Sequence, residues 1–105
     1  MTVTCHLRLF VRGRTPQAHR AVDALRRIHQ RVEASGIAVR VEVIDVAEDP
    51  QAAEDARILA TPTLVRESPP PARRVIGDLS DTALAMAALD LEGLEGVAGD
   101  LARGV

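Results

Sequence analysis

The hydrophobic period of residues 3–46 changes twice, and this double change most narrows the folds open to the chain. Apolar residues occupy every odd position of residues 3–11, which predicts a strand with one buried face. Apolar residues then recur three and four positions apart over residues 18–32, which predicts an amphipathic helix. Residues 37–46, "IAVRVEVIDV", predict a second strand. Since strand-helix-strand crossovers are right-handed and join parallel strands, we expect an α/β fold.

Capping residues mark where the predicted helices begin. A side chain that accepts a backbone hydrogen bond precedes each of three helical segments. The pairs are Thr15 and Pro16, Asp49 and Pro50, and Ser80 and Asp81. The first helix is expected to end at Ser35 and Gly36, the second to cover 51–59, and the third 82–91. Residues 61–67 and 73–77 predict two more strands, and the "SPPPA" stretch between them predicts a stiff connection, because proline cannot donate to a ladder.

Composition excludes several classes of function. The chain has one aromatic residue, Phe10, so it has no stacking platform for single-stranded nucleic acid. It has one cysteine, Cys5, which excludes an internal disulfide and a multi-thiolate metal site and fits a reducing cytosol. Cys5 alternates with buried leucines, so we expect an inert core thiol. We predict no metal site at His6, His19 or His29, no cofactor, no membrane or nucleic-acid partner, and a cytoplasmic location.

Charge is arranged in blocks although the formal net charge is only −2. Residues 1–40 carry +6, residues 41–56 carry −6, residues 57–74 carry +3 and residues 75–105 carry −5. All thirteen basic residues are arginines, whose forked donors suit carboxylate recognition. We expect one domain over residues 1–91, followed by a flexible tail over 92–105 that contains four glycines.

Three segments resemble the KaiB family of circadian-clock proteins, a branch of the thioredoxin-like fold. They are "LRLFVRGRTP", "VIDVAEDPQAAEDARILATPTLVRESPPPARRVIGDLSD" and "ALDL", and the resemblance covers roughly residues 5–91. It implies a thioredoxin-like βαβ-α-ββα domain. It also implies a second, ground-state arrangement of the C-terminal half, in which KaiB proteins self-associate as dimers or tetramers.

The resemblance implies a non-enzymatic adaptor that binds the N-terminal ATPase ring of a KaiC-like protein and regulates its phosphorylation and ATPase cycle. The basic positions that match the family, together with residues 58–63, are the expected partner-binding residues. They are Arg20, Arg57, Ile58, Leu59, Ala60, Thr61, Pro62, Thr63, Arg66 and Arg74. Glu42 stands where cyanobacterial members commonly have lysine, so a KaiA-like protein and a different effector both stay open as further partners.

The C-terminal half carries the residues expected to take part in fold switching. They are Pro62, Pro69, Pro70, Pro71, Ala88 and Asp90. Pro62 is also the candidate for a cis peptide bond, because thioredoxin-like folds place one before the third strand. Ala88 replaces a glycine found in many family members, and alanine favours a helix over glycine by about 1 kcal/mol. We therefore expect Ala88 to favour the thioredoxin-like arrangement if it lies in a helix there.

Two other functions are open. The turn "GRTP", residues 13–16, stands where thioredoxins carry their Cys-x-x-Cys pair, and it has no thiol to attack or resolve a disulfide. A glutathione-dependent redox protein using the turn at Thr15 is one alternative. The other is a sensory or docking module like the KaiB-related input region of a clock histidine kinase.

Overall fold

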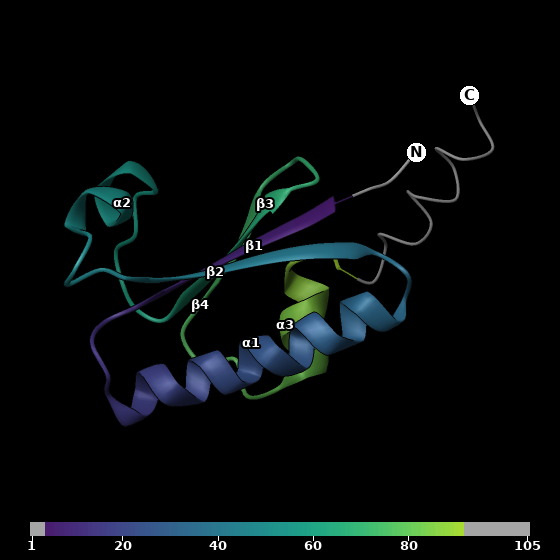
Figure 1. Ribbon diagram of the computed structural model, residues 1–105, viewed down its shortest axis with the longest axis horizontal. Helices are drawn as coiled ribbons and strands as arrows, with labels where there is room; N and C mark the ends of the chain where they lie inside the picture. The colour runs from purple at the N-terminus through teal and green to yellow at the C-terminus, as the bar shows by residue number, and fades with distance from the viewer. Residues whose placement is uncertain (1–3, 92–105) are drawn as a thin grey trace.

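A computed structural model describes residues 4–91 of the 105-residue chain. Four strands and three helices follow one another in the order predicted from the sequence (Figure 1). They are β1 (Thr4–Val11), α1 (Pro16–Ala34), β2 (Ala38–Asp45), α2 (Pro50–Asp55), β3 (Thr63–Ser68), β4 (Arg73–Ile76) and α3 (Thr82–Ala88). The predicted tail over 92–105 lies outside the described residues.

The strands form a single sheet in the order β2-β1-β3-β4. The β1 and β2 strands are parallel, as the crossover predicts, while β3 pairs antiparallel with both β1 and β4. The α1 and α3 helices lie on one side of this sheet, and α2 lies near one end on the other side (Figure 1). The βαβ-α-ββα arrangement predicted from the sequence is confirmed.

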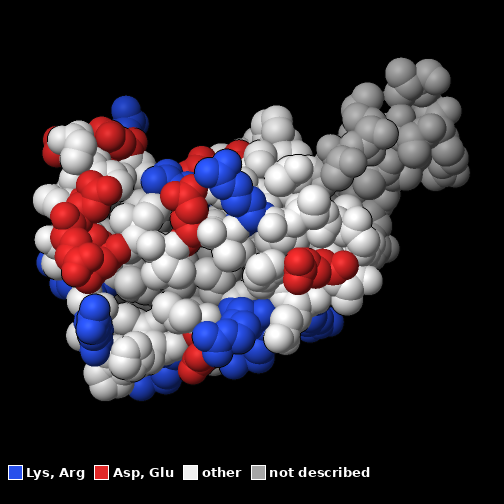
Figure 2. Space-filling model, in the orientation of Figure 1, with Lys and Arg blue, Asp and Glu red and all other residues white. Residues whose placement is uncertain are grey.

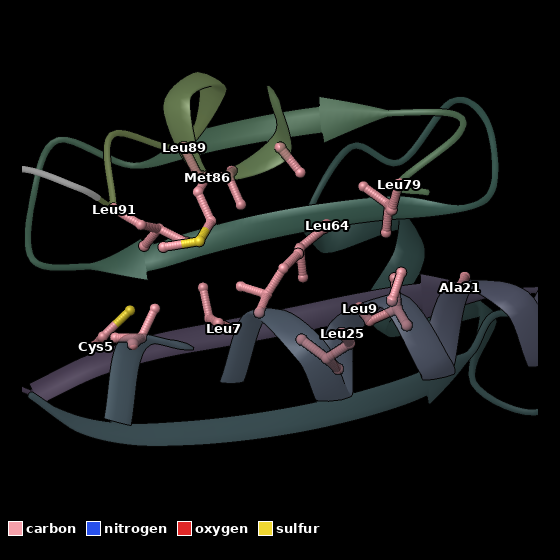
Figure 3. Packing of buried hydrophobic residues seen from close by; sticks show 14 of the residues in the cluster. Cys5, Leu7, Leu9, Ala21, Leu25, Leu64, Leu79, Met86, Leu89 and Leu91 are labelled. Carbon is pink, nitrogen blue, oxygen red and sulfur yellow. The ribbon is translucent and has the colours of Figure 1, made fainter. Parts of the chain in front are cut away.

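The main core lies between the sheet and the two helices α1 and α3. Leu7 and Leu9 alternate along β1 with residues of the opposite face, so both point toward the helices (Figure 3). Leucine, alanine, valine and isoleucine supply most of the filling. The side chains labelled in the figure are Cys5, Leu7, Leu9, Ala21, Leu25, Leu64, Leu79, Met86, Leu89 and Leu91. Cys5 is fully buried, as predicted.

A second, smaller cluster lies on the other face of the sheet. Phe10, Val46 and Val65 are its buried members, and alanines of α2 pack against them with Ile58. The Arg8 guanidinium lies 5.0 Å from the centre of the Phe10 ring. This cluster anchors α2 to the sheet, and it therefore positions the loop that follows α2.

The predicted helix starts are confirmed, whereas two predicted helix ends are wrong. The caps accept backbone hydrogen bonds as expected, from Ala18 to Thr15 at 3.0 Å, from Ala52 to Asp49 at 3.1 Å and from Leu84 to Asp81 at 3.0 Å. However, α2 ends at Asp55 instead of residue 59, and α3 ends at Ala88 instead of residue 91.

Both early ends show the same backbone reversal. Arg57 and Asp90 adopt positive φ values of 55° and 53°, which stop a right-handed helix. After α3 this reversal buries Leu89 and Leu91 together, which a continuing helix would not do at a spacing of two residues.

Candidate protein-interaction site

The α2–β3 loop, residues 56–62, carries most of the residues predicted to bind a partner. It starts with a Schellman cap, in which the amide of Arg57 donates to Glu54 at 3.0 Å and that of Ile58 to Ala53 at 2.9 Å. The cap turns Ile58 inward to the Phe10 cluster. Leu59, the next residue, projects outward with an exposed fraction of 94%. The loop thus presents a leucine to solvent on a hydrogen-bonded base.

Arg74 of β4 ties this loop to the edge of the sheet. Its two terminal nitrogens donate to the carbonyl oxygens of Arg57, at 3.2 Å, and Ala56, at 2.9 Å. The Ala56 carbonyl is at the end of the helix, where it has no intrahelical partner, and the Arg57 carbonyl follows it. Arg74 is exposed, as predicted for a partner-binding residue, but its guanidinium also holds the loop in place.

Two clefts flank the α2–β3 loop. One, of about 310 Å³, lies between the loop and the end of β2, and its walls include Arg12, Val46 and Leu59. The other, of about 500 Å³, lies over the sheet beside α2, and its walls include Arg8 and Arg57. The loop therefore stands between two hollows, each with an arginine in its wall.

Acidic and basic side chains occupy different parts of the surface. Acidic side chains gather over α2 and the turn before it, and arginines line α1 along the bottom of the view (Figure 2). The acidic residues of this segment are Asp45, Glu48, Asp49, Glu54 and Asp55. The alternating charge blocks of the sequence therefore become separate surface regions in the fold.

The structure does not bring every predicted contact residue to this loop. Arg20 is exposed on α1 and lines a third cleft, of about 450 Å³, together with Asp78 and Ser80.

Pro62, the last residue of the loop, is buried. Its peptide bond with Thr61 is cis as predicted, and its carbonyl accepts from the amide of Gly77 at 2.9 Å.

Besides Pro62, two more of the predicted contact residues are buried. Thr63 is 1% exposed, and its hydroxyl donates to the Ala60 carbonyl at 2.6 Å, so it supports the loop from beneath. Arg66 is 3% exposed on the face of β3 that meets the α1 and α3 helices. Arg66 pairs across the sheet with Leu7 and so shares the core face, not the surface expected of a contact residue. Its role in partner binding stays a prediction.

The residues predicted for fold switching lie in two places. Pro69, Pro70 and Pro71 form the connection between β3 and β4, in which the bonds preceding Pro69 and Pro71 are cis. Ala88 is the last residue of α3 and Asp90 has a positive φ just beyond it. Ala88 therefore does lie in a helix in this arrangement.

Several side chains near the site were missed from the sequence. Arg8 and Glu67 pair at 3.2 Å, and His6 and Glu42 at 2.6 Å, on the sheet face that carries α2. Alternation along β1 is the signal that could have found Arg8 and His6, since it places them opposite Leu7 and Leu9. Glu42, noted above for replacing a lysine, thus has a partner within its own sheet.

Asp45 links two turns near the loop. Its carboxylate accepts from the amides of Gly13, at 3.0 Å, and Ala47, at 2.9 Å. These backbone hydrogen bonds, Gly13 first, hold the pKa of Asp45 below its ordinary value. Gly13 itself has a φ of 65°, which suits glycine at this turn. The turn that carries a redox pair in thioredoxins is here joined to the turn before α2.

Cys5 lies in an environment that suppresses thiol chemistry. It is fully buried, and burial raises the pKa of its thiol to about 11, against a smaller lowering effect of the Arg66 charge. A thiol with this pKa is almost wholly protonated near neutral pH, and the thiolate is the reactive form.

No helix among residues 4–91 has both the length and the apolar character needed to cross a membrane.

Comparisons with known proteins agree with one another. The model of the KaiB domain family matches residues 8–91. The circadian clock oscillator protein KaiB of Prochlorococcus marinus (strain MIT 9312) is 49% identical over 85 residues, which cover 81% of this chain and 79% of that protein. That of Synechococcus sp. (strain CC9311) is 49% identical with 81% and 70% covered.

Solved structures show the same relationship. The N-terminal domain of Synechococcus elongatus SasA superposes with a TM-score of 0.66 at 33% identity, covering 79% of this chain and 78% of that one. Chloroplastic thioredoxin z superposes with a TM-score of 0.65 at 22% identity, covering 86% and 80%, which supports the thioredoxin-like fold alone.

Proposed function

Since this chain belongs to the KaiB family of circadian clock proteins, we propose that it is a non-enzymatic adaptor that binds the N-terminal ATPase ring of a KaiC-like protein. Binding regulates the phosphorylation and ATPase cycle of that ring. The observation that supports this proposal most directly is the α2–β3 loop. Within a family-matched segment, it presents Leu59 at 94% exposure on a base fixed by hydrogen bonds.

The loop has the features of a protein-docking element. An exposed leucine beside an arginine provides an apolar anchor with a forked donor for a carboxylate on the partner. Leu59 would fill an apolar pocket, and Arg57, held by its cap, would bind an acidic side chain beside it. The Arg74 bonds to this loop keep the two groups at a constant spacing, which lowers the ordering cost of binding.

Co-purification with a KaiC homologue, with and without nucleotide, tests the proposal. The wild-type chain should form a complex in at least one nucleotide state. The Leu59→Ala variant should bind at least about tenfold more weakly, the loss expected when an anchor residue is truncated. Leu84→Ala is the matched control, since Leu84 is also an exposed leucine, 68% exposed on α3. Equal binding by Leu59→Ala and the wild type would contradict the assignment of the loop, and absence of any complex would contradict the function.

The chemistry of the chain supports an adaptor over a thiol enzyme. The turn at Thr15 contains no cysteine, and Cys5 is buried with a raised thiol pKa. Glutathione-dependent disulfide reduction by the purified protein is the corresponding assay. Measurable turnover that survives in a Cys5→Ala variant would favour the redox protein.

A second candidate function is a KaiB-like sensory or docking module, which the likeness to the SasA N-terminal domain favours. A module of this kind would bind its partner without changing the partner's chemistry. ATP hydrolysis and phosphorylation of the ring, measured with and without the chain, separate the two functions, because only a regulator changes these rates.

Fold switching and self-association also belong to this proposal. The C-terminal half would adopt a second arrangement in which the chain forms dimers or tetramers, while the thioredoxin-like arrangement binds the ring. A KaiA-like protein or another effector would bind the resulting complex in the cytoplasm.

The Ala88→Gly variant tests fold switching. Helix propensity predicts a shift of about fivefold in the populations, away from the arrangement in which Ala88 ends α3. NMR populations measure this ratio, and an unchanged ratio would contradict the role of Ala88.

A further inference from the structure

Arg66 is a buried cation whose hydrogen bonds go to the backbone. Its side chain leaves β3 on the core face and is 3% exposed. One terminal nitrogen donates to the carbonyl of Pro71 at 2.8 Å, and the other to the carbonyl of Asp90 at 3.4 Å. The ion pairs within residues 4–91 do not include Arg66, and its Nε has no hydrogen-bond partner there. Carbonyl dipoles are therefore the groups seen to offset the cost of burying this charge.

The two acceptors belong to different segments of the chain. Pro71 lies in the connection between β3 and β4, where three successive prolines have no amide hydrogens to donate. Asp90 follows α3 with a φ of 53°, a conformation that costs energy for a residue other than glycine. The acceptors lie 5 and 24 residues beyond Arg66 in the chain. A single guanidinium thus spans two segments that are distant from each other in sequence.

We propose that Arg66 is a buried clasp that couples the β3–β4 connection to the C-terminal end of α3, so that the two segments loosen together when the clasp opens. At the α3 end, Arg66 holds the Schellman cap of the helix. In this cap the amide of Leu91 donates to the carbonyl of Met86 at 2.9 Å. Loss of the guanidinium removes a charged donor from both segments at once. This role in positioning the backbone requires no partner protein and does not depend on the proposed function.

The Arg66→Met variant distinguishes the proposed clasp from a side chain that only fills space in the core. Methionine fills much of the space of the arginine stem, and it removes a buried charge that has no carboxylate partner among the described residues. Replacing such a charge by an apolar side chain is often neutral for global stability. The urea midpoint of unfolding should therefore change little. Amide exchange at Leu91 should become roughly tenfold faster, the effect of losing one charge-assisted hydrogen bond.

Coupling needs a second readout and a control. The heteronuclear NOE of Ala72, next to Pro71, should fall in Arg66→Met, while exchange at Ile28 in α1 should stay as in the wild type. Arg73→Met is the matched control, because Arg73 pairs with Arg66 across the strands but is exposed. It should leave Leu91 and Ala72 unchanged.

Three results would overturn the proposal. They are exchange at Leu91 within twofold of the wild type, acceleration at Leu91 without a change at Ala72, and equal acceleration at Leu91 and Ile28. If Arg66→Met does not fold, Arg66→Lys provides the same test, since its ammonium keeps the charge but lacks the fork that reaches two carbonyls. Loosening at Leu91 and Ala72 would again support the clasp, and wild-type behaviour at both would overturn it.

Discussion

The α2 and α3 helices end in the same backbone motif, and the residues beyond the two ends have opposite fates. Each helix closes with a Schellman cap built on a residue other than glycine, Arg57 or Asp90. After α2, the chain exposes Leu59 to 94%. After α3, Leu91 is 4% exposed and joins the main core. The cap thus determines the local path of the chain, while the surface it meets determines whether a leucine becomes core or contact.

The two ends also differ in the arginine that supports them. Arg74 reaches the α2 cap from the exposed edge of β4, and Arg66 reaches the α3 cap from the buried face of β3. Both donate to carbonyls at or just beyond a helix end. We infer that a surface partner can reach the α2 end, while the α3 end depends on the interior of the protein.

The largest difference should appear when a leucine is shortened at each end. Leu89→Ala should lower the free energy of unfolding by about 2–5 kcal/mol, because Leu89 is fully buried and its truncation leaves a cavity. Leu59→Ala should change it by less than about 0.5 kcal/mol. Urea unfolding followed by circular dichroism measures both. A loss at Leu59 equal to that at Leu89 would mean that the α2–β3 loop is packed in solution.

Removing the supporting arginines should give the next largest difference. Arg66→Ala should lower the free energy of unfolding by about 2–3 kcal/mol, since it loses charged hydrogen bonds and leaves unfilled core volume. Arg74→Ala should cost less than about 1 kcal/mol, because Arg74 is exposed and water replaces its bonds. The same urea experiment serves, and equal losses would remove the distinction between a buried and a surface support.

Glycine at the two cap positions should stabilise the protein slightly. Positive φ is unfavourable for a side-chain-bearing residue, and Asp tolerates it better than Arg. Arg57→Gly should therefore raise the free energy of unfolding by about 0.5 kcal/mol, and Asp90→Gly by less. Thermal unfolding would show whether Arg57→Gly raises the stability more than Asp90→Gly does. A loss of stability in both variants would show that their side chains contribute more than the backbone strain they carry.

The smallest effect concerns the carboxylates that precede the two helices. Hydrogen bonds, from the Gly13 amide to Asp45 and from the Ser80 amide to Asp78, lower the pKa of each carboxyl below its ordinary value. A carboxyl with a lowered folded-state pKa contributes stability above its unfolded pKa, and this contribution is lost as pH falls through the folded value.

We expect both carboxyls to contribute to a fall in the free energy of unfolding below about pH 4. Asp45→Asn and Asp78→Asn should each make the acid dependence of stability shallower, which urea titrations at several pH values would measure. Identical acid profiles for the variants and the wild type would show that these bonds do not contribute.

Much of this fold follows from local sequence. The period change over residues 3–46 predicted the crossover and its parallel strands, and Thr15, Asp49 and Asp81 predicted three helix starts. Alternation along β1 predicted the burial of Cys5. Each of these features depends on residues within a few positions of one another, which is why a pattern in the sequence suffices. The family motifs then predicted the thioredoxin-like arrangement and the location of the candidate loop.

What the sequence determined by itself was therefore the identity of the elements, where the helices begin and which face of the first strand is buried. Only the tertiary structure decided that Arg66 is buried, that Leu59 is exposed, and that α2 and α3 stop early. These outcomes depend on contacts between distant segments: β3 with the end of α3, and β4 with the end of α2. No local pattern records which carbonyl a long arginine side chain will reach once the strands are paired.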